Sequence, residues 1–168
     1  MDSLWAPWRL SYVARLESDG VRPKASQCFI CAAWGETGRE RQNLVLGRSP
    51  RALALLNRYP YVNGHLLIAP AAHIATLDEA EDCAAEIWSL LIQAQDALMA
   101  EMKPDGFNVG INLGQAAGAG LADHLHVHLV PRWRGDVNFM TVAAETRVIS
   151  QALDSAWETL NPYFRVEK

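Results

Sequence analysis

The sequence predicts an α+β domain built from an antiparallel sheet, one long helix and a C-terminal helix, with the helices on one side of the sheet. Three observations support this class. Short apolar stretches bounded by turn residues predict strands, a long stretch with helical spacing follows them, and strands resume after it. The chain has 168 residues, half of them hydrophobic. That size suits a single domain over 1–168 with its own core.

The first strands are predicted in the N-terminal half. The segments RQNLVLGRSP (41–50) and RALALLNRYP (51–60) indicate two short strands that meet near Pro50. In NGHLLIAP (63–70) the Asn-Gly pair is typical of a hairpin turn, and an apolar strand follows it. These segments therefore predict consecutive strands of the sheet.

The spacing of apolar residues then changes. Over residues 78–102 they recur three and four positions apart, which predicts a long helix. Thr76 with Glu79, or Asp78 with Glu81, would form a capping box at its start. The letters KPDG that follow predict its end, because proline and glycine stop helices.

The remaining elements follow the long helix. GFNVGINLG (106–114) predicts a strand, and QAAGAGLA (115–122) predicts a loop of small residues. The next strand would end near 132–135, and a last helix is expected over 148–160. The order is strands, long helix, strands and helix.

The segment DHLHVHLVPRW (123–133) places histidines at alternate positions of a predicted strand. Side chains alternate between the two faces of a strand, so His124, His126 and His128 would share one face. A buried imidazole without a partner costs free energy, so this face is expected to meet water, a metal or a charged ligand. Imidazole is a nucleophile near neutral pH and also a proton donor. The pattern therefore predicts a phosphate-transfer site.

Two of the three cysteines form a C-x-x-C pair, Cys28 and Cys31. Such a pair is either redox-active or half of a zinc site. There is no second C-x-x-C, so histidine must complete a tetrahedral site. Cys83 falls on the apolar stripe of the long helix, where core packing is expected. The candidate histidines are His65, His73, His124, His126 and His128.

Charge and composition restrict the partners and the compartment. The formal net charge of −4 argues against general nucleic-acid binding through neutralisation of the phosphates. No apolar run reaches the length of a membrane span, and the first residues lack the pattern of a signal peptide. An odd number of cysteines argues against a secreted disulfide framework. We therefore expect a cytoplasmic protein without nucleic-acid or membrane partners.

The segment HLHVHLV resembles the signature of the histidine-triad (HIT) family of nucleotide hydrolases and transferases. LWAPWR, ALALLNRYPYVNGHLLIAP, GFNVGINLGQAAGAG and HLHVHLVPRWRGDVNFM together resemble the bacterial branch that includes diadenosine tetraphosphate phosphorylases. This resemblance implies a HIT-like core over about 28–140, an N-terminal arm over 1–27 and a C-terminal helical extension over 141–168. It also implies a homodimer whose sheets are joined.

The resemblance implies catalytic roles for three histidines. His126 would attack the α-phosphorus and form a covalent nucleotidyl intermediate. His128 would meet the scissile bridging oxygen or the α-phosphate. His65 matches a family histidine in the hydrogen-bond network around the nucleophile.

The resemblance also implies nucleotide contacts and a zinc site. Asn57 matches a position that contacts the ribose, and Asn112 matches a polar residue near the phosphates. The small-residue loop departs from the family pattern and is one residue longer, so phosphate contacts are expected from the backbone of Gly118, Ala119 and Gly120. The metal-binding branch implies a structural zinc, with no organic cofactor. Its ligands would be Cys28, Cys31, His73 and His124, which separates His124 from the catalytic group.

The enzyme that these features predict cleaves dinucleoside polyphosphates, with water, inorganic phosphate or another group as the acceptor. The branch resemblance favours phosphate. The alternatives are a HIT nucleotidyl transferase or nucleoside phosphoramidate hydrolase, and a non-catalytic zinc-stabilised nucleotide-binding protein. Hexose-1-phosphate uridylyltransferases are disfavoured because their chains are about twice as long and carry glutamine where His128 stands. A redox protein would explain neither the histidines nor the loop.

Overall fold

A computed structural model of the chain describes residues 28–136 and 152–164. The predicted N-terminal arm over 1–27 lies outside the described residues, as do 137–151 and 165–168 of the predicted C-terminal extension. No helix of the described part is long and apolar enough to cross a membrane.

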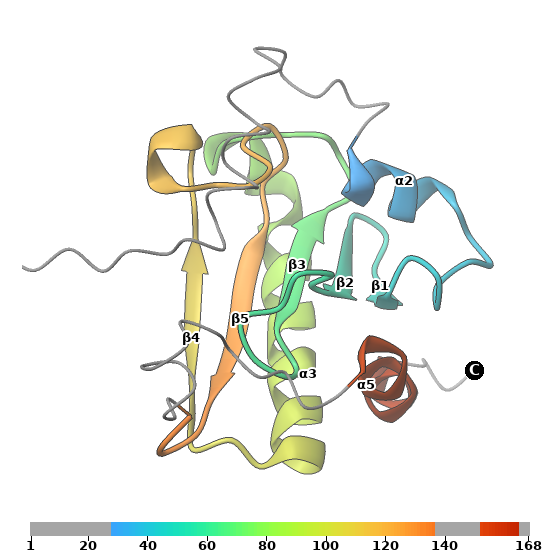
Figure 1. Cartoon of the computed structure of the whole chain (residues 1–168). Helices are drawn as coiled ribbons and strands as arrows, with labels where there is room; N and C mark the ends of the chain where they lie inside the picture. Colours follow the sequence, from blue (N-terminus) through green and yellow to red (C-terminus); the bar gives the residue numbers. More distant parts are fainter. Residues whose placement is uncertain (1–27, 137–151, 165–168) are drawn as a thin grey trace, which may run out of the picture.

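A five-stranded sheet forms the centre of the described part (Figure 1), and every neighbouring pair of strands is antiparallel. The strand order is β1-β2-β3-β5-β4, so β5 lies between β3 and the edge strand β4. The predicted antiparallel sheet is therefore confirmed. The strands are β1 (Val45–Arg48), β2 (Ala52–Leu56), β3 (Leu66–Pro70), β4 (Gly106–Ile111) and β5 (Val127–Arg132).

The long helix runs behind the sheet in Figure 1 as α3 (Ala84–Met102). A 3₁₀ helix, η2 (Asp78–Cys83), precedes it, so the prediction of one α-helix over 78–102 is wrong for its first six residues. Cys83 has φ −113° and ψ 1°, which departs from helical geometry and separates the two helices. The predicted end is confirmed, because the following Lys103 is left-handed, with φ 48°.

Residues 148–151 of the predicted C-terminal helix lie outside the described residues, and within these the helix starts at Leu153. α5 (Leu153–Leu160) continues into the 3₁₀ helix η4 (Asn161–Phe164). The backbone of Ala152 is extended, so the helix begins at the next residue. Trp157 Nε1 donates to the carbonyl oxygen of Val45 at 2.8 Å, which attaches α5 to β1. This bond places the helix beside the first strand.

One helix lies on the other face of the sheet, so the expectation that all helices share one side is wrong. This helix, α2 (Phe29–Gly35), starts inside the C-x-x-C pair. Its residues Ile30 and Ala33 are three positions apart, and both are buried against the sheet. The residues that they join are Val45, Leu53, Leu55, Leu67 and Ala69.

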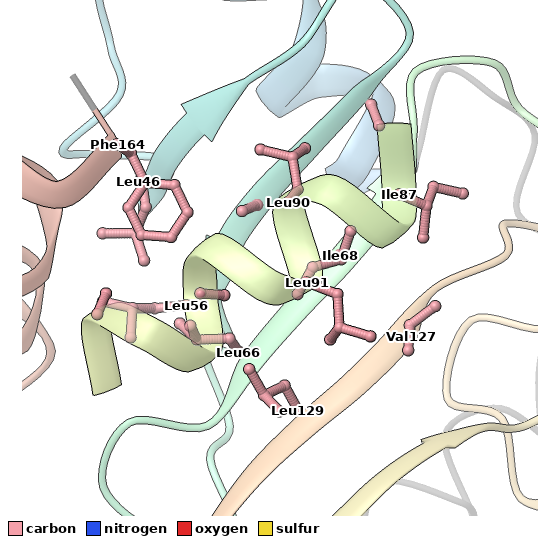
Figure 2. Packing of buried hydrophobic residues seen from close by; sticks show 14 of the residues in the cluster. Leu46, Leu56, Leu66, Ile68, Ile87, Leu90, Leu91, Val127, Leu129 and Phe164 are labelled. Carbon is pink, nitrogen blue, oxygen red and sulfur yellow. The ribbon is translucent and has the colours of Figure 1, made fainter. Parts of the chain in front are cut away.

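The main core lies between α3 and the sheet (Figure 2). Leu125, Val127 and Leu129 all belong to it, so the aliphatic residues between the histidines face α3 as predicted. Cys83 is also part of this core, as predicted. The larger side chains labelled in Figure 2 are Leu46, Leu56, Leu66, Ile68, Ile87, Leu90, Leu91, Val127, Leu129 and Phe164.

The link between β2 and β3 is wider than a two-residue turn. It is closed by the N–H of Asn57, which donates to the carbonyl oxygen of His65 at 2.9 Å. Gly64 has φ +73°, and a Cβ there would lie 2.7 Å from Met102 Sδ and 2.8 Å from Leu98 Cδ2. A Cβ here would displace the side chains of Met102 and Leu98 and would strain a backbone with positive φ, so glycine suits the position before His65.

Candidate active site and metal centre

The histidine segment is a strand over only part of its length. β5 begins at Val127, so the prediction of a strand through all three histidines is wrong for His124 and His126. Residues 70–74 diverge from the segment before β5, so the regular backbone pairing between β3 and β5 stops there. Two other contacts take its place. His124 Nε2 lies 2.9 Å from the carbonyl oxygen of Pro70, and the N–H of Leu125 donates to the carbonyl oxygen of Ile74. The histidines still lie on the face opposite α3.

His126 has its tautomer set by a backbone oxygen. Its Nδ1 lies 2.8 Å from the carbonyl oxygen of His124. A carbonyl oxygen can only accept, so Nδ1 holds the proton and Nε2 holds the lone pair. Burial lowers the pKa of His126, against a smaller opposing effect of this hydrogen bond. The ring is therefore neutral at physiological pH, with Nε2 available as a nucleophile.

His128 has the opposite tautomer, set through His65. The N–H of Tyr61 donates to His65 Nδ1 at 3.1 Å, so the proton of that ring is on Nε2. His65 Nε2 lies 3.0 Å from His128 Nδ1 and donates to it. Because Nδ1 of His128 accepts this hydrogen bond, the proton of this ring is on Nε2. The ring centroids of His126 and His128 are 4.9 Å apart. The ring with the Nε2 lone pair and the ring with the Nε2 proton are therefore neighbours.

Asn57 belongs to the same network. Its Oδ1 accepts from the N–H of Tyr59 at 2.9 Å. That bond identifies the other amide atom, Nδ2, as the one 3.3 Å from His65 Nδ1. The same Nδ2 lies 3.4 Å from His65 Nε2, so the amide contacts the imidazole as a whole and does not select its tautomer. The ribose contact that the resemblance implies stays a prediction.

The remaining predicted nucleotide residues lie in or beside the loop from β4 to β5. In β4, Gly110 pairs with His128, and a Cβ at this glycine would meet nothing within 4 Å. Among the described residues, nothing therefore fills the space next to this glycine. Asn112 lies two positions after Gly110, just past the end of β4, and alternation would direct it to the same face. Gly118 is left-handed, with φ +81°, and Ala119 is buried while Gly118 and Gly120 are half-buried. Contact of these residues with phosphate stays a prediction.

The four predicted metal ligands converge in the structure. The Sγ atoms of Cys28 and Cys31 and the Nδ1 atoms of His73 and His124 all lie within 4.8 Å of one another. Cys28 to His124, Cys31 to His73 and His73 to His124 are each 3.2 Å, and Cys31 to His124 is 3.5 Å. Neighbouring ligands of a tetrahedral zinc lie about 3.3–3.8 Å apart. The donor types and the spacing therefore fit a zinc ion.

Local chemistry also suits the binding of a cation. The contact of His124 Nε2 with the oxygen of Pro70 puts the proton on Nε2 and leaves the Nδ1 lone pair for the metal. Burial is the main reason why the pKa of His124 falls to about 4. Burial, and then the neighbouring Cys28, raises the pKa of Cys31 to about 11 in the absence of a metal ion. A cation would supply the charge that thiolate ligands need.

One residue of the network was not singled out from the sequence. The ring of Tyr61 lies 4.6 Å from that of His65 and 6.1 Å from that of His128. Tyr61 stands in the turn-forming stretch NRYPYVNGH, where its aromatic ring has no periodic partner. Only the folding of the β2–β3 link over β5 brings it to the histidines.

Acidification is expected to destabilise the fold between about pH 6.5 and pH 3. Burial, and then the rings of His128 and His126, lower the pKa of His65 from 6.5 to about 3. Over this interval the unfolded chain binds the proton and the folded chain does not, so stability is lost as the pH falls. For this residue the loss is up to about 1.4 kcal/mol per pH unit. Urea unfolding from about pH 7 to pH 4 measures it, and an equally steep dependence in His65→Gln would contradict it.

Comparisons with known proteins agree with this geometry. The HIT domain model matches residues 38–135. An AP-4-A phosphorylase from Mycobacterium tuberculosis is 38% identical over 156 residues, which cover 91% of this chain and 79% of that protein. A hypothetical histidine triad nucleotide-binding protein from Sulfolobus tokodaii superposes with a TM-score of 0.65 at 26% identity, over 82% of this chain and 91% of that one.

A zinc-bound histidine triad family protein from Mycobacterium smegmatis has the same fold. Its TM-score is 0.65 at 22% identity, with 83% of this chain and 94% of that chain covered. The HIT match spans more than half of the sequence, and it includes the three histidines predicted to be catalytic and two of the four cluster residues. Sequence, fold and site thus agree, and the chain belongs to the HIT domain family.

Proposed function

We propose that the chain cleaves dinucleoside polyphosphates of the diadenosine tetraphosphate type by phosphorolysis. The observation that carries this proposal is the pair of opposite tautomers: a lone pair on His126 Nε2 beside a proton on His128 Nε2. Displacement at phosphorus needs both a nucleophile and a donor to the leaving oxygen. The similarity to an AP-4-A phosphorylase favours inorganic phosphate as the acceptor.

In the first proposed step, His126 Nε2 attacks the α-phosphorus. A P–N bond forms, and the bond from the α-phosphorus to the bridging oxygen breaks. His128 Nε2–H donates a hydrogen bond to that oxygen, which leaves with the bonding electron pair. ATP leaves, and adenylyl-His126 remains. Inorganic phosphate then attacks the same phosphorus, the P–N bond breaks, and ADP is released. The two steps convert diadenosine tetraphosphate and phosphate to ATP and ADP.

The proposed substrate contacts lie around the open space beside Gly110. Asn57 would contact the ribose and Asn112 the phosphates, while the backbone N–H groups of Gly118, Ala119 and Gly120 would contact phosphate oxygens. Phosphoryl transfer relies mainly on such positioning and on charge stabilisation.

We also propose that the four-residue cluster holds a structural zinc. The ligands would be Cys28, Cys31, His73 and His124, with no position left open for chemistry. When bound, zinc would attach the start of α2 to the segment before β5. The solved M. smegmatis protein is described as zinc-bound, which supports this choice of metal.

The assembly and the location in the cell are also proposals. Strand β4 is at the edge of the sheet, and its Val109 and Ile111 are 51% and 37% exposed. An apolar edge strand favours pairing with a second copy, which supports the predicted sheet-joined homodimer. Free thiols in the described residues suit the reducing cytoplasm. The domain would have its core over about 28–140.

The acceptor is tested by supplying diadenosine tetraphosphate with and without inorganic phosphate. We expect ATP and ADP only when phosphate is present, with label from isotopic phosphate found in the β-position of ADP. ATP and AMP in phosphate-free buffer would identify a hydrolase instead. A lack of turnover in both buffers, with the metal-loaded chain, would contradict the proposed activity.

A further inference from the structure

The ring of Tyr61 lies against the two hydrogen-bonded histidines His65 and His128. It is tilted by 39° to the ring of His65, with centroids 4.6 Å apart. It is nearly parallel to the ring of His128, at 22° and 6.1 Å. The histidine rings themselves are tilted by 45°. The three rings form one cluster, in which Tyr61 contributes both a backbone donor and an aromatic face.

We propose that Tyr61 is a positioning residue for His128, and that its ring shields the hydrogen bond from His65 to His128 and orients both imidazoles. This proposal rests on the proposed function, in which His128 donates from Nε2 to the leaving oxygen. The backbone N–H of Tyr61 fixes the tautomer of His65. The side chain would hold the geometry through which that tautomer reaches His128.

The link that carries Tyr61 is braced at several points. The N–H of Tyr59 donates to Asn57 Oδ1 at 2.9 Å, and the N–H of His65 contacts the oxygen of Val62 at 3.3 Å. Pro60 immediately precedes the tyrosine and restricts the backbone there. The ring therefore sits on a constrained support, which a positioning residue requires.

The exposed fractions of His65 and Tyr61 fit a role in which the tyrosine ring covers the histidine. His65 is 0% exposed, whereas Tyr61 is 39% exposed. One part of the tyrosine therefore meets solvent while another covers the imidazole pair. A hydrogen bond between two neutral rings is weakened when water competes for its donor. Removing the aromatic face would admit water to His65 Nε2–H and allow the ring of His128 to rotate.

A substrate-binding role for Tyr61 makes a different kinetic prediction. A platform for a nucleotide base would stabilise ground state and transition state equally, so its loss would raise KM at unchanged kcat. Loss of positioning at His128 would instead lower kcat at unchanged KM. The two roles are therefore separated by the kinetic constant that changes.

The test compares Tyr61→Leu, Tyr61→Met and Tyr61→Phe in the full-length, metal-loaded chain, with Tyr59→Leu as the matched control. Tyr59 belongs to the same link, and its side chain is 75% exposed. Diadenosine tetraphosphate with phosphate is the assay substrate. NMR follows the Nε2 proton of His65 and its exchange with water, with the signal assigned by its absence in His65→Gln. Circular dichroism and thermal unfolding verify folding.

We expect Tyr61→Leu and Tyr61→Met to lower kcat about tenfold at unchanged KM, and to broaden the His65 proton signal by faster exchange. Tyr61→Phe and Tyr59→Leu should stay within about twofold of wild type in kcat, with a sharp signal. Unchanged kcat and exchange in the folded Leu and Met variants would overturn the proposal, as would a rise in KM alone. If the wild type lacks turnover, the proposed function fails. The shielding role is still tested separately in that case, because slow exchange of the His65 Nε2 proton in Tyr61→Leu would refute it.

Discussion

Replacing His126 by alanine is expected to lower phosphate-dependent turnover of diadenosine tetraphosphate by roughly 10⁴-fold or more. The ring supplies the only atom of the chain proposed to form a bond with phosphorus, and its Nε2 lone pair is set by the Nδ1 contact with the carbonyl oxygen of His124. His126→Gln is expected to fail equally, because an amide keeps the polarity but supplies no nucleophilic nitrogen. Turnover is measured from ATP and ADP released per chain.

His128→Gln is the matched comparison for this loss. An amide N–H can still donate a hydrogen bond to the leaving oxygen, so this variant is expected to lose roughly 10²-fold. Intact-mass measurement on acid-free samples, with diadenosine tetraphosphate but without phosphate, would detect one added nucleotidyl group in wild type and none in His126→Ala. A His126→Ala chain that folds and keeps a tenth of the wild-type turnover would contradict the nucleophile.

Replacing Cys28 by serine is expected to remove the metal ion and to destabilise the fold by at least about 3 kcal/mol, or roughly 8 °C in Tm. Cys28 is buried, and its Sγ lies 3.2 Å from His124 Nδ1. Loss of the ion would release the start of α2 from the segment before β5. Metal content by elemental analysis and thermal unfolding with and without a chelator measure both effects.

Cys83→Ala is the matched control for the metal prediction. Cys83 is a buried cysteine in the α3-side core, where its Sγ contacts the carbonyl oxygen of Ala80. We expect this variant to keep about one metal ion per chain and to lose only about 1 kcal/mol. The chelator should lower the Tm of wild type and Cys83→Ala but not that of Cys28→Ser. A wild type with no metal, or with no response to the chelator, would contradict the zinc site.

Local patterns predicted most of the architecture. Strands were expected around β1, β2, β3, β4 and β5, and all five are present. The errors have tertiary causes. Nothing in the helical spacing reveals that Cys83 separates a 3₁₀ helix from α3. The seven residues of α2 are too short for a periodic pattern, and they are helical because Ile30 and Ala33 bury against the sheet.

Sequence and resemblance together indicated the four residues that converge in the metal cluster and the histidines proposed to be catalytic, because both sets depend on residue types at particular spacings. Neither indicated Tyr61, whose role depends on a contact between the β2–β3 link and β5. The metal cluster shows the same limit: His73 and His124 are far apart in sequence, and only the fold places their Nδ1 atoms 3.2 Å from each other.

The sequence by itself determined that this chain has the histidine-triad pattern, with its imidazoles expected on one face, and a C-x-x-C pair that needs histidine to complete a metal site. Alternation and spacing are local properties, so they can be inferred from the order of residues. Only the tertiary structure decided which nitrogen of each ring holds the proton. That choice depends on backbone atoms that the fold brings to each ring: the oxygen of Pro70 for His124, the oxygen of His124 for His126, and the N–H of Tyr61 acting through His65 for His128. Three similar side chains thereby differ in the nitrogen that each has available, which underlies the roles of ligand, nucleophile and donor that we propose for them.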